Sequence, residues 1–174
     1  MFDLMLFTDG SVDTKTHIGF GAYLAIENID IPAADVVAKV KTKQFDNTSS
    51  TPLELQTLLW ALDDAQLFNA EKLIQVVVYS DSQNIVNLLA RRSRLEQRDF
   101  YANNGARLRH AALYQEFFTA MDQCACTIIN LQGHKPLHAK SSIDLIFSLV
   151  DKASRSALRQ FNRQTSYEPL SATQ

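Results

Sequence analysis

The spacing of hydrophobic positions predicts three strands at the start of the chain. Residues 4–8 form a short apolar run that is typical of a buried strand, and the Asp-Gly-Ser that follows is a turn signal. Residues 18–27 form a second apolar run, whose two glycines indicate a close approach of backbone or ligand. Residues 36–45 alternate apolar and basic side chains, as a half-exposed strand does. The short connections between these strands predict an antiparallel meander.

The pattern then changes to helical spacing. Thr51 offers an N-cap, Pro52 a proline at the first helical position, and Glu54 an acid three residues after the cap. Apolar residues follow at i, i+3, i+4 and i+7 through Ala65, which gives this helix one buried face. The sequence therefore predicts that the first helix begins at Thr51.

The remainder of the chain alternates strands with helices. A polar and basic stretch over 91–109 interrupts this alternation at Asn103-Asn104-Gly105. The other predicted elements are a buried strand over 73–80, a helix opening at Asp81-Ser82, a helix over 108–122, a strand over 126–131 and a helix over 142–163. A meander followed by such alternation implies an α/β fold with one mixed sheet covered by helices.

The length of 174 residues fits one domain that buries a substantial core, which we expect to span 1–164 before a polar tail over 165–174. The first residues lack a basic n-region, and no apolar run approaches the roughly 20 residues of a transmembrane helix. We therefore expect no secretory signal and no membrane partner.

Cys124 and Cys126 are badly spaced for a disulfide, and no second pair completes a zinc site. They indicate reduced thiols in a cytoplasmic protein.

The net charge of −2 conceals an asymmetry along the chain. Residues 1–90 contain five basic and twelve acidic side chains, whereas residues 91–163 contain twelve basic and six acidic ones. A clustered basic region matters more for phosphate binding than the total charge does. The same cluster is equally compatible with a solvated helical face.

Three acids follow or begin predicted elements, where rigid backbone can aim them at one point. Each has an ordinary structural explanation: Asp9 as a turn residue, Glu54 as part of a capping box with Thr51, and Asp81 as an N-cap. Together they suit Mg²⁺, which prefers oxygen ligands, and two such ions can hold both oxygens of a phosphodiester displacement.

Four short motifs, in order, resemble those of type 1 ribonucleases H over roughly residues 4–160. They are Phe7-Thr8-Asp9-Gly10-Ser11 with Gly19-Phe20-Gly21-Ala22, Thr51-Pro52-Leu53-Glu54-Leu55, Val77-Val78-Tyr79-Ser80-Asp81-Ser82-Gln83, and Leu131-Gln132-Gly133-His134. The resemblance implies the ribonuclease H-like fold, a five-stranded mixed sheet with the first strand central. It also implies two Mg²⁺ ions, or Mn²⁺, and an RNA–DNA hybrid as substrate. We expect a monomer.

The resemblance implies roles residue by residue. Asp9 would bridge both ions, Glu54 and Asp81 would hold the ion at the leaving 3′ oxygen, and a last aspartate would hold the ion that activates water. His134 would assist proton movement or product release. The substrate contacts would be Gly10, Ser11 and Gln83, the last of these in the minor groove where 2′-hydroxyls are displayed.

The last aspartate has two candidates. Asp144 follows His134 by ten residues, which is the family's spacing. The residues around Asp151 resemble the family's helix better, although Asp151 requires a loop that is longer by about seven residues, which loops tolerate. We favour Asp151 and keep Asp144 as the alternative.

Some features depart from the family. The basic stretch over 91–109 has no tryptophan, and it could follow a phosphate backbone, face solvent or bind a partner. His134 and His138 have zinc-ligand spacing, but Pro136 between them disfavours a helix.

The sequence predicts an endonuclease that cuts the RNA strand of hybrids and leaves 5′-phosphate and 3′-hydroxyl ends. The alternatives are a nuclease acting on another nucleic acid and a non-catalytic binding module.

Overall fold

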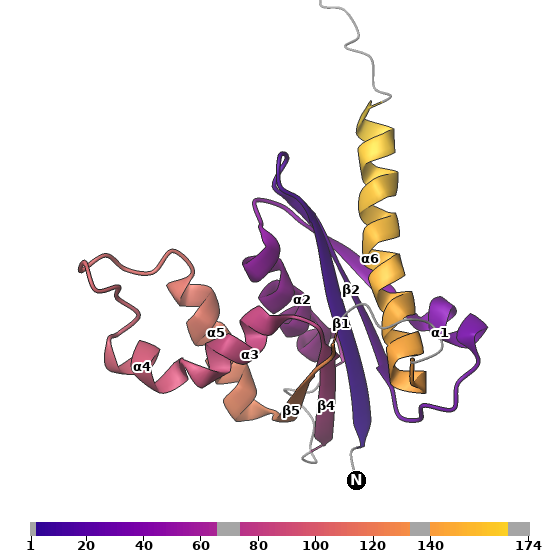
Figure 1. The fold of residues 1–174 in the computed structure, drawn as a ribbon, viewed down its shortest axis with the longest axis horizontal. Helices are drawn as coiled ribbons and strands as arrows, with labels where there is room; N and C mark the ends of the chain where they lie inside the picture. Colours follow the sequence, from indigo (N-terminus) through magenta and orange to yellow (C-terminus); the bar gives the residue numbers. More distant parts are fainter. Residues whose placement is uncertain (1–2, 66–73, 133–139, 167–174) are drawn as a thin grey trace, which may run out of the picture.

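The centre of the fold is its first strand. The computed structural model describes residues 3–65, 74–132 and 140–166, and its sheet has the order β3-β2-β1-β4-β5 (Figure 1). The pairs β1–β2 and β2–β3 are antiparallel, whereas β1–β4 and β4–β5 are parallel. The strands are β1 (Leu4–Asp13), β2 (Ile18–Ile26), β3 (Lys41–Phe45), β4 (Gln75–Ser80) and β5 (Ala125–Asn130). The predicted mixed five-stranded sheet with the first strand central is confirmed.

Helices cover both faces of this sheet, and Figure 1 shows α6 standing on the side of β1 and β2 that is opposite to α2, α3 and α5. The helices are α1 (Ala33–Lys39), α2 (Ser50–Asp64), α3 (Gln83–Ala90), α4 (Arg92–Gln97), α5 (Ala111–Gln123) and α6 (Ser142–Ser166). The expected domain boundary after residue 164 falls inside α6. No helix in the described ranges is long and apolar enough to cross a membrane.

Alternation along β1 produces two separate cores. Leu6 packs with the leucines of α2 and the phenylalanines of α5. Phe7 points to the opposite face, where it packs with Ile146 and Val150 of α6. Because successive side chains of a strand alternate, Asp9 lies on the same face as Phe7 and therefore toward α6.

The predicted strand over 36–45 is wrong in its first half. The chain forms α1 up to Lys39 and only then β3. Helical geometry lets Val36 and Val40, four residues apart, both pack against the core beneath α6, and Val36 is 1% exposed. Ala38, which a strand would place on the same face as Val36 and Val40, is exposed instead. The alternation of apolar and basic residues is therefore compatible with a strand, although its first half forms a short helix.

The predicted turn after Phe7 and Thr8 is also wrong. β1 continues through Asp13, with Gly10 paired to Gly21 of β2, and the hairpin turn lies at residues 14–17. His17 takes the positive φ of 58° at the end of that turn. Asp9 therefore sits in the middle of a long strand and not at its end.

The glycines of β1 and β2 allow α2 to lie unusually close to the sheet. A Cβ added at Gly10 or at Gly19 would lie 2.8 Å from side-chain carbons of Leu53, and a Cβ at Gly21 would overlap Thr57. Such separations are too short for real carbon contacts, so the absence of these Cβ atoms fixes how deeply α2 sits. Glu54 follows Leu53 directly, and its position depends on the same close approach.

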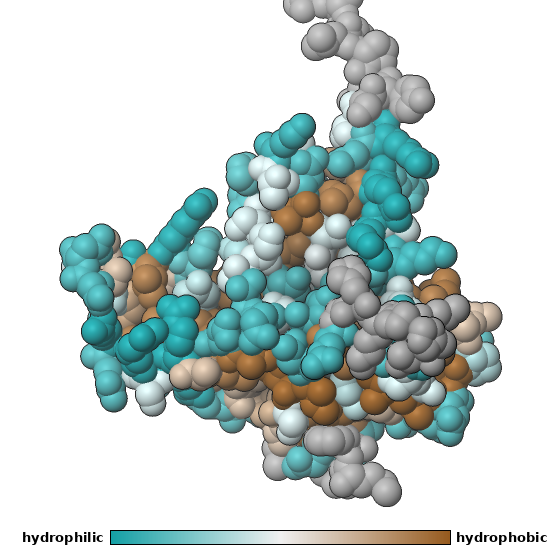
Figure 2. Space-filling view, in the orientation of Figure 1, coloured by the Kyte–Doolittle hydropathy of each residue, from teal (hydrophilic) through white to brown (hydrophobic). Residues whose placement is uncertain are grey.

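The basic stretch predicted over 91–109 projects from the body of the molecule. It contains α4 and a loop closed by an antiparallel bridge between Tyr101 and Arg107, with Gly105 at a φ of 77°. Figure 1 shows this projection beside α3 and α5, and Figure 2 shows mostly hydrophilic side chains on it. The Asn-Asn-Gly break was thus a correct turn signal.

We expect Gly21→Ala to destabilise the protein by about 1–3 kcal/mol, because the new methyl group meets Thr57. Thr57→Ala should relieve part of this loss, since Thr57 Oγ1 is buried without a hydrogen-bond partner and its removal breaks no bond. Urea unfolding of both single variants and the double variant measures the coupling. Additive losses would contradict the close approach.

Candidate active site

Asp9 and Asp81 come from neighbouring parallel strands. Phe7 of β1 pairs with Tyr79 of β4, and their rings stack with centroids 4.9 Å apart. Asp9 and Asp81 each lie two residues beyond this pair in the same strand direction, so the two acids lie side by side just past the carboxyl end of β4. Asp81 follows β4 directly, as the sequence predicted, and its side chain is exposed. The N-cap of α3 is Ser82, so Asp81 is not the cap that its sequence position also suggested.

Glu54 approaches the same place from the opposite face. The predicted capping box with Thr51 is wrong, because α2 begins at Ser50 and its N-cap, Ser49, makes no side-chain cap bond. Glu54 Oε1 lies 3.8 Å from the point where a Cβ of Gly10 would stand. Glu54 Oε2 is buried and has no hydrogen-bond partner among the described residues. The structural explanation for this glutamate therefore does not apply, and it retains a buried, unsatisfied oxygen.

Burial and mutual repulsion dominate the electrostatics of these acids. Asp9 is only 7% exposed, and burial raises its pKa to about 7. The charges of Asp81 and Asp151 contribute to this rise in the pKa of Asp9, whereas the hydrogen bond from Ser154 opposes it. Burial raises the pKa of Glu54 to about 9, with the charges of Asp9 and Asp81 acting in the same direction. Four carboxylates from four regions of the chain are thus linked by their charges.

The two candidates for the fourth acid have different surroundings. Asp144 closes a capping box at the start of α6, where its Oδ2 accepts from the backbone N and the Oγ of Ser141 at 2.8 and 2.7 Å. The Ser141 hydroxyl oxygen in turn lies 3.2 Å from the Asp144 backbone N. Asp151 lies two turns farther along α6, pairs with Arg155, and adds to the repulsion at Asp9. The structure gives Asp144 an evident structural role and places Asp151 beside Asp9.

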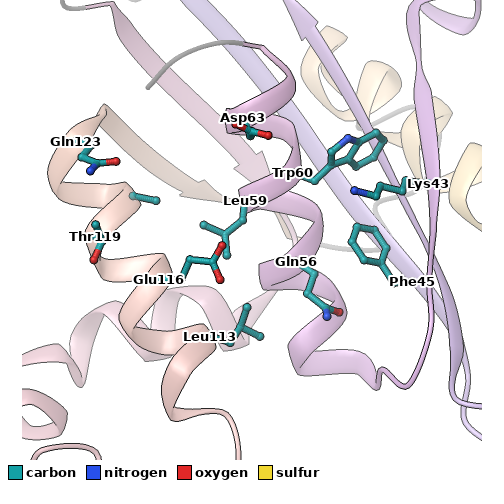
Figure 3. A pocket seen from close by; sticks show the side chains of 11 residues that line it. Lys43, Phe45, Gln56, Leu59, Trp60, Asp63, Leu113, Glu116, Thr119 and Gln123 are labelled. Atoms are coloured by element: carbon teal, nitrogen blue, oxygen red, sulfur yellow. The ribbon is translucent and has the colours of Figure 1, made fainter. Parts of the chain in front are cut away.

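Two cavities lie near these elements. One of about 590 Å³ is lined by Asp81, Asp144 and Asp151, with Lys140 and Arg155 also on its wall. The other, of about 650 Å³, lies between α2 and α5 and is shown in Figure 3. None of the four acids lines that larger cavity. Two of the four acids, Asp81 and Asp151, line the smaller cavity, which is therefore the candidate site despite its smaller volume.

The larger cavity has a different character. Lys43 lies between Phe45 and Trp60 in Figure 3, with its Nζ 5.4 and 5.6 Å from the two ring centroids. Glu116 and Asp63 approach the same groove from α5 and α2. These contacts are cation–π interactions and mixed charges without a cluster of metal-ligating groups.

The residues expected to contact substrate lie around the carboxylates. Ser11 occupies the same face of β1 as Asp9, and Gly10 carries the close approach of Leu53. Gln83, exposed at the start of α3, donates to Asn87 Oδ1 at 3.1 Å and accepts from Asn130 Nδ2 at 3.0 Å. Its amide is therefore held from both ends. His134 and His138 lie outside the described residues.

Sequence reasoning missed three residues that bear on this site. Asn87 and Asn130 hold Gln83, and Ser154 bonds to Asp9. The signal for Asn87 was its i+4 spacing from Gln83, and the signal for Ser154 was a serine within the apolar stripe of α6. Nothing in the sequence connects Asn130 with Gln83, because their contact depends on the pairing of β4 with β5.

These acids fit a divalent cation by their chemistry. They offer hard oxygen donors, one buried oxygen without a partner, and repulsion that a cation would relieve. Within residues 3–65, 74–132 and 140–166, no three histidine, cysteine or acidic side chains are already placed to hold a metal ion. The acids are therefore neighbours whose side chains have not converged into a coordination shell.

Comparison with known proteins identifies the family. Residues 2–148 match the family model described as RNase H, and the chain belongs to this family of nucleases. The match ends within α6, three residues before Asp151. Among solved structures, the chain is similar to a foamy viral protease-reverse transcriptase in complex with dsDNA, with 13% identity and a TM-score of 0.62. That alignment covers 89% of this chain and 96% of the other, and at such identity it shows the fold alone. No curated protein matches.

The raised pKa values predict a stability that falls with pH in EDTA. Protonation of Asp9 and Glu54 stabilises the fold fully below their unfolded pKa values, near 4, and this contribution is lost as the pH rises through about 7 and about 9. Glu54→Gln should therefore raise the free energy of unfolding at about pH 8 by roughly 1–3 kcal/mol and flatten the pH dependence. Urea unfolding between about pH 5 and 9 measures both effects, with exposed Glu116→Gln as the control. Identical pH profiles for Glu54→Gln and wild type would contradict this account.

Proposed function

We propose that this protein is an endonuclease that hydrolyses the RNA strand of RNA–DNA hybrids with two divalent cations, leaving 5′-phosphate and 3′-hydroxyl ends. The observation that carries the proposal is the burial of Asp9 and Glu54 beside Asp81 and Asp151, with pKa values raised by burial and by one another's charge. Buried like charges are costly without a cation. In a nuclease of this family, a bound cation would both offset that cost and take part in phosphodiester hydrolysis.

The residues that would hold Mg²⁺ or Mn²⁺ are Asp9, Glu54, Asp81 and Asp151. Two bound ions would stabilise the attacking and the leaving oxygen of the phosphodiester. The protein's own contribution is to fix these carboxylates on rigid elements, β1, α2, the end of β4 and α6. Burial strengthens every electrostatic interaction that they make with substrate phosphate.

Gln83 would recognise the RNA strand. One amide hydrogen of Gln83 is used on Asn87 and one lone pair of its oxygen on Asn130, which leaves a donor and an acceptor available. A 2′-hydroxyl is both donor and acceptor, and A-form geometry displays it in a wide, shallow minor groove. An amide held at both ends can distinguish RNA from DNA at this position without reading the sequence.

The basic projection would bind the phosphate backbone. Arg91, Arg94 and Arg98 line a hollow of about 300 Å³ together with Tyr101. Arg92 has a structural role instead, since it bridges to Asp122 at 2.6 Å and to Glu96 at 2.7 Å, with its guanidinium 5.0 Å from the Phe118 ring centroid. Arginines beside an exposed tyrosine suit a nucleic-acid backbone, because cationic and stacking contacts act together.

The deciding experiment is cleavage of an end-labelled RNA–DNA hybrid with and without Mg²⁺ or Mn²⁺. We expect metal-dependent cutting of the RNA strand, which Asp9→Asn or Asp151→Asn reduces on the order of 100-fold or more while folding is kept. Asp144→Asn should keep the activity and lose about 1 kcal/mol of stability with its capping box.

Asp13→Asn is the matched control, since Asp13 lies on the same face of β1 and bonds to Asn162 of α6. Full activity in Asp9→Asn would reject the mechanism. Loss in Asp144→Asn, with Asp151→Asn active, would exchange the two assignments. Cutting of duplex DNA in place of the hybrid would favour a nuclease with another substrate, and binding of hybrid without any cutting would favour a binding module.

The basic projection makes a separate prediction. Replacing Arg94 and Arg98 together by alanine should raise KM several-fold at about 150 mM salt, leave kcat within twofold and reduce the salt dependence of binding. Lys39→Ala, on α1 at the opposite side of the sheet, serves as the control. An unchanged KM and salt dependence would assign the projection to solvent or to another partner.

A further inference from the structure

Ser154 is a polar residue on the buried face of α6. Ile146, Val150, Ser154 and Leu158 follow one another at four-residue spacing and form the buried stripe of the helix. Ser154 is 0% exposed in this stripe. A buried hydroxyl is costly unless it is hydrogen-bonded, so its partners explain why a serine is tolerated at this position.

The Ser154 hydroxyl has two partners, and only one of them belongs to its own helix. Its Oγ lies 2.9 Å from the carbonyl oxygen of Asp151 and 2.5 Å from Oδ2 of Asp9. The carbonyl contact is an ordinary one for a helical hydroxyl, which Thr165 repeats with the carbonyl of Phe161. That contact alone would satisfy the hydroxyl. The contact with Asp9 joins α6 to β1, and it is at the short end for a hydroxyl donating to a carboxylate. Because a hydroxyl has a single hydrogen, the shorter of its two contacts marks Asp9 as the main acceptor.

We propose that Ser154 is a positioning residue of the nuclease: its hydroxyl fixes the orientation of the Asp9 carboxylate and ties it to the turn of α6 that carries Asp151. The proposal rests on the proposed function. Each carboxylate oxygen has two lone pairs, so Oδ2 can accept from Ser154 and still bind a cation. The same contact sets the separation of two acids that lie far apart in the sequence.

Positioning of this kind affects the cation and the chemistry more than the hybrid. Without the hydroxyl, the Asp9 side chain can rotate about its χ angles in the space that Ser154 leaves. A carboxylate that is free to turn binds a cation less tightly, and a misplacement of about 1 Å can lower a rate on the order of 100-fold. The hybrid binds through other groups, so its KM is independent of this contact.

Ser154→Ala tests the proposal, with Ser154→Cys as a near-isosteric second variant. We expect kcat to fall about tenfold or more, KM for the hybrid to stay within twofold, and the Mg²⁺ concentration for half-maximal activity to rise several-fold. Calorimetry with Mn²⁺ alone should show binding that is several-fold weaker than in wild type. Thr165→Ala loses a hydroxyl from the same helix away from the site, and it should match wild type in every assay.

The outcomes separate this proposal from the proposed function. Wild-type kcat and Mg²⁺ dependence in both Ser154 variants, or a rise in KM alone, would overturn the positioning role. If wild type cuts no hybrid, the proposed function fails, and Mn²⁺ calorimetry still decides on Ser154. Weaker Mn²⁺ binding in the variants would support its role, whereas equal binding, or none to wild type, would overturn it. A changed melting temperature with unchanged kcat and Mn²⁺ affinity would make Ser154 merely structural.

Discussion

The closeness of α2 to the sheet is the constraint on which the rest of the site depends. Gly10, Gly19 and Gly21 leave room for Leu53 and Thr57 to press against the backbone of β1 and β2. A helix at ordinary distance would hold the Glu54 carboxylate away from the strand. Asp9 points toward α6 and Glu54 comes from α2, so their charges act on each other across a part of the sheet that carries no side chain. Gly10 provides that opening.

This arrangement concentrates negative charge where the protein is least able to solvate it. The cores above and below β1 stabilise the fold through burial of aliphatic and aromatic side chains. The acids oppose that gain, as the raised pKa values of Asp9 and Glu54 show. Strain of this kind is characteristic of functional sites, where the geometry of a reaction takes precedence over the stability of the metal-free fold.

The sequence was sufficient for the sheet, for four of the described helices (α2, α3, α5 and α6) in outline and for the family, because buried strands and amphipathic helices leave clear periodic signals. It was not sufficient where one pattern fits two structures. Val36 and Val40 satisfy both a strand and a short helix, and the packing of α6 decides between them. The glycine after Asp9 is compatible both with a turn and with a strand against which a helix packs closely. Its pairing with Gly21 in the sheet shows that it belongs to a strand. Contacts such as Asn130 with Gln83 had no sequence signal, since they depend on strand register.

The distribution of the four acids along the chain has a consequence for biosynthesis. Asp9, Glu54 and Asp81 lie in the first half of the sequence, whereas Asp151 and Ser154 lie on α6, which is synthesised after the other described helices. A nascent chain whose α6 is still inside the ribosome can fold much of the sheet, yet it has neither the fourth acid nor the hydroxyl that orients the first. By our assignment, such a chain cannot cut an RNA–DNA hybrid. Synthesis itself then delays the nuclease until the chain has left the ribosome far enough for α6 to dock.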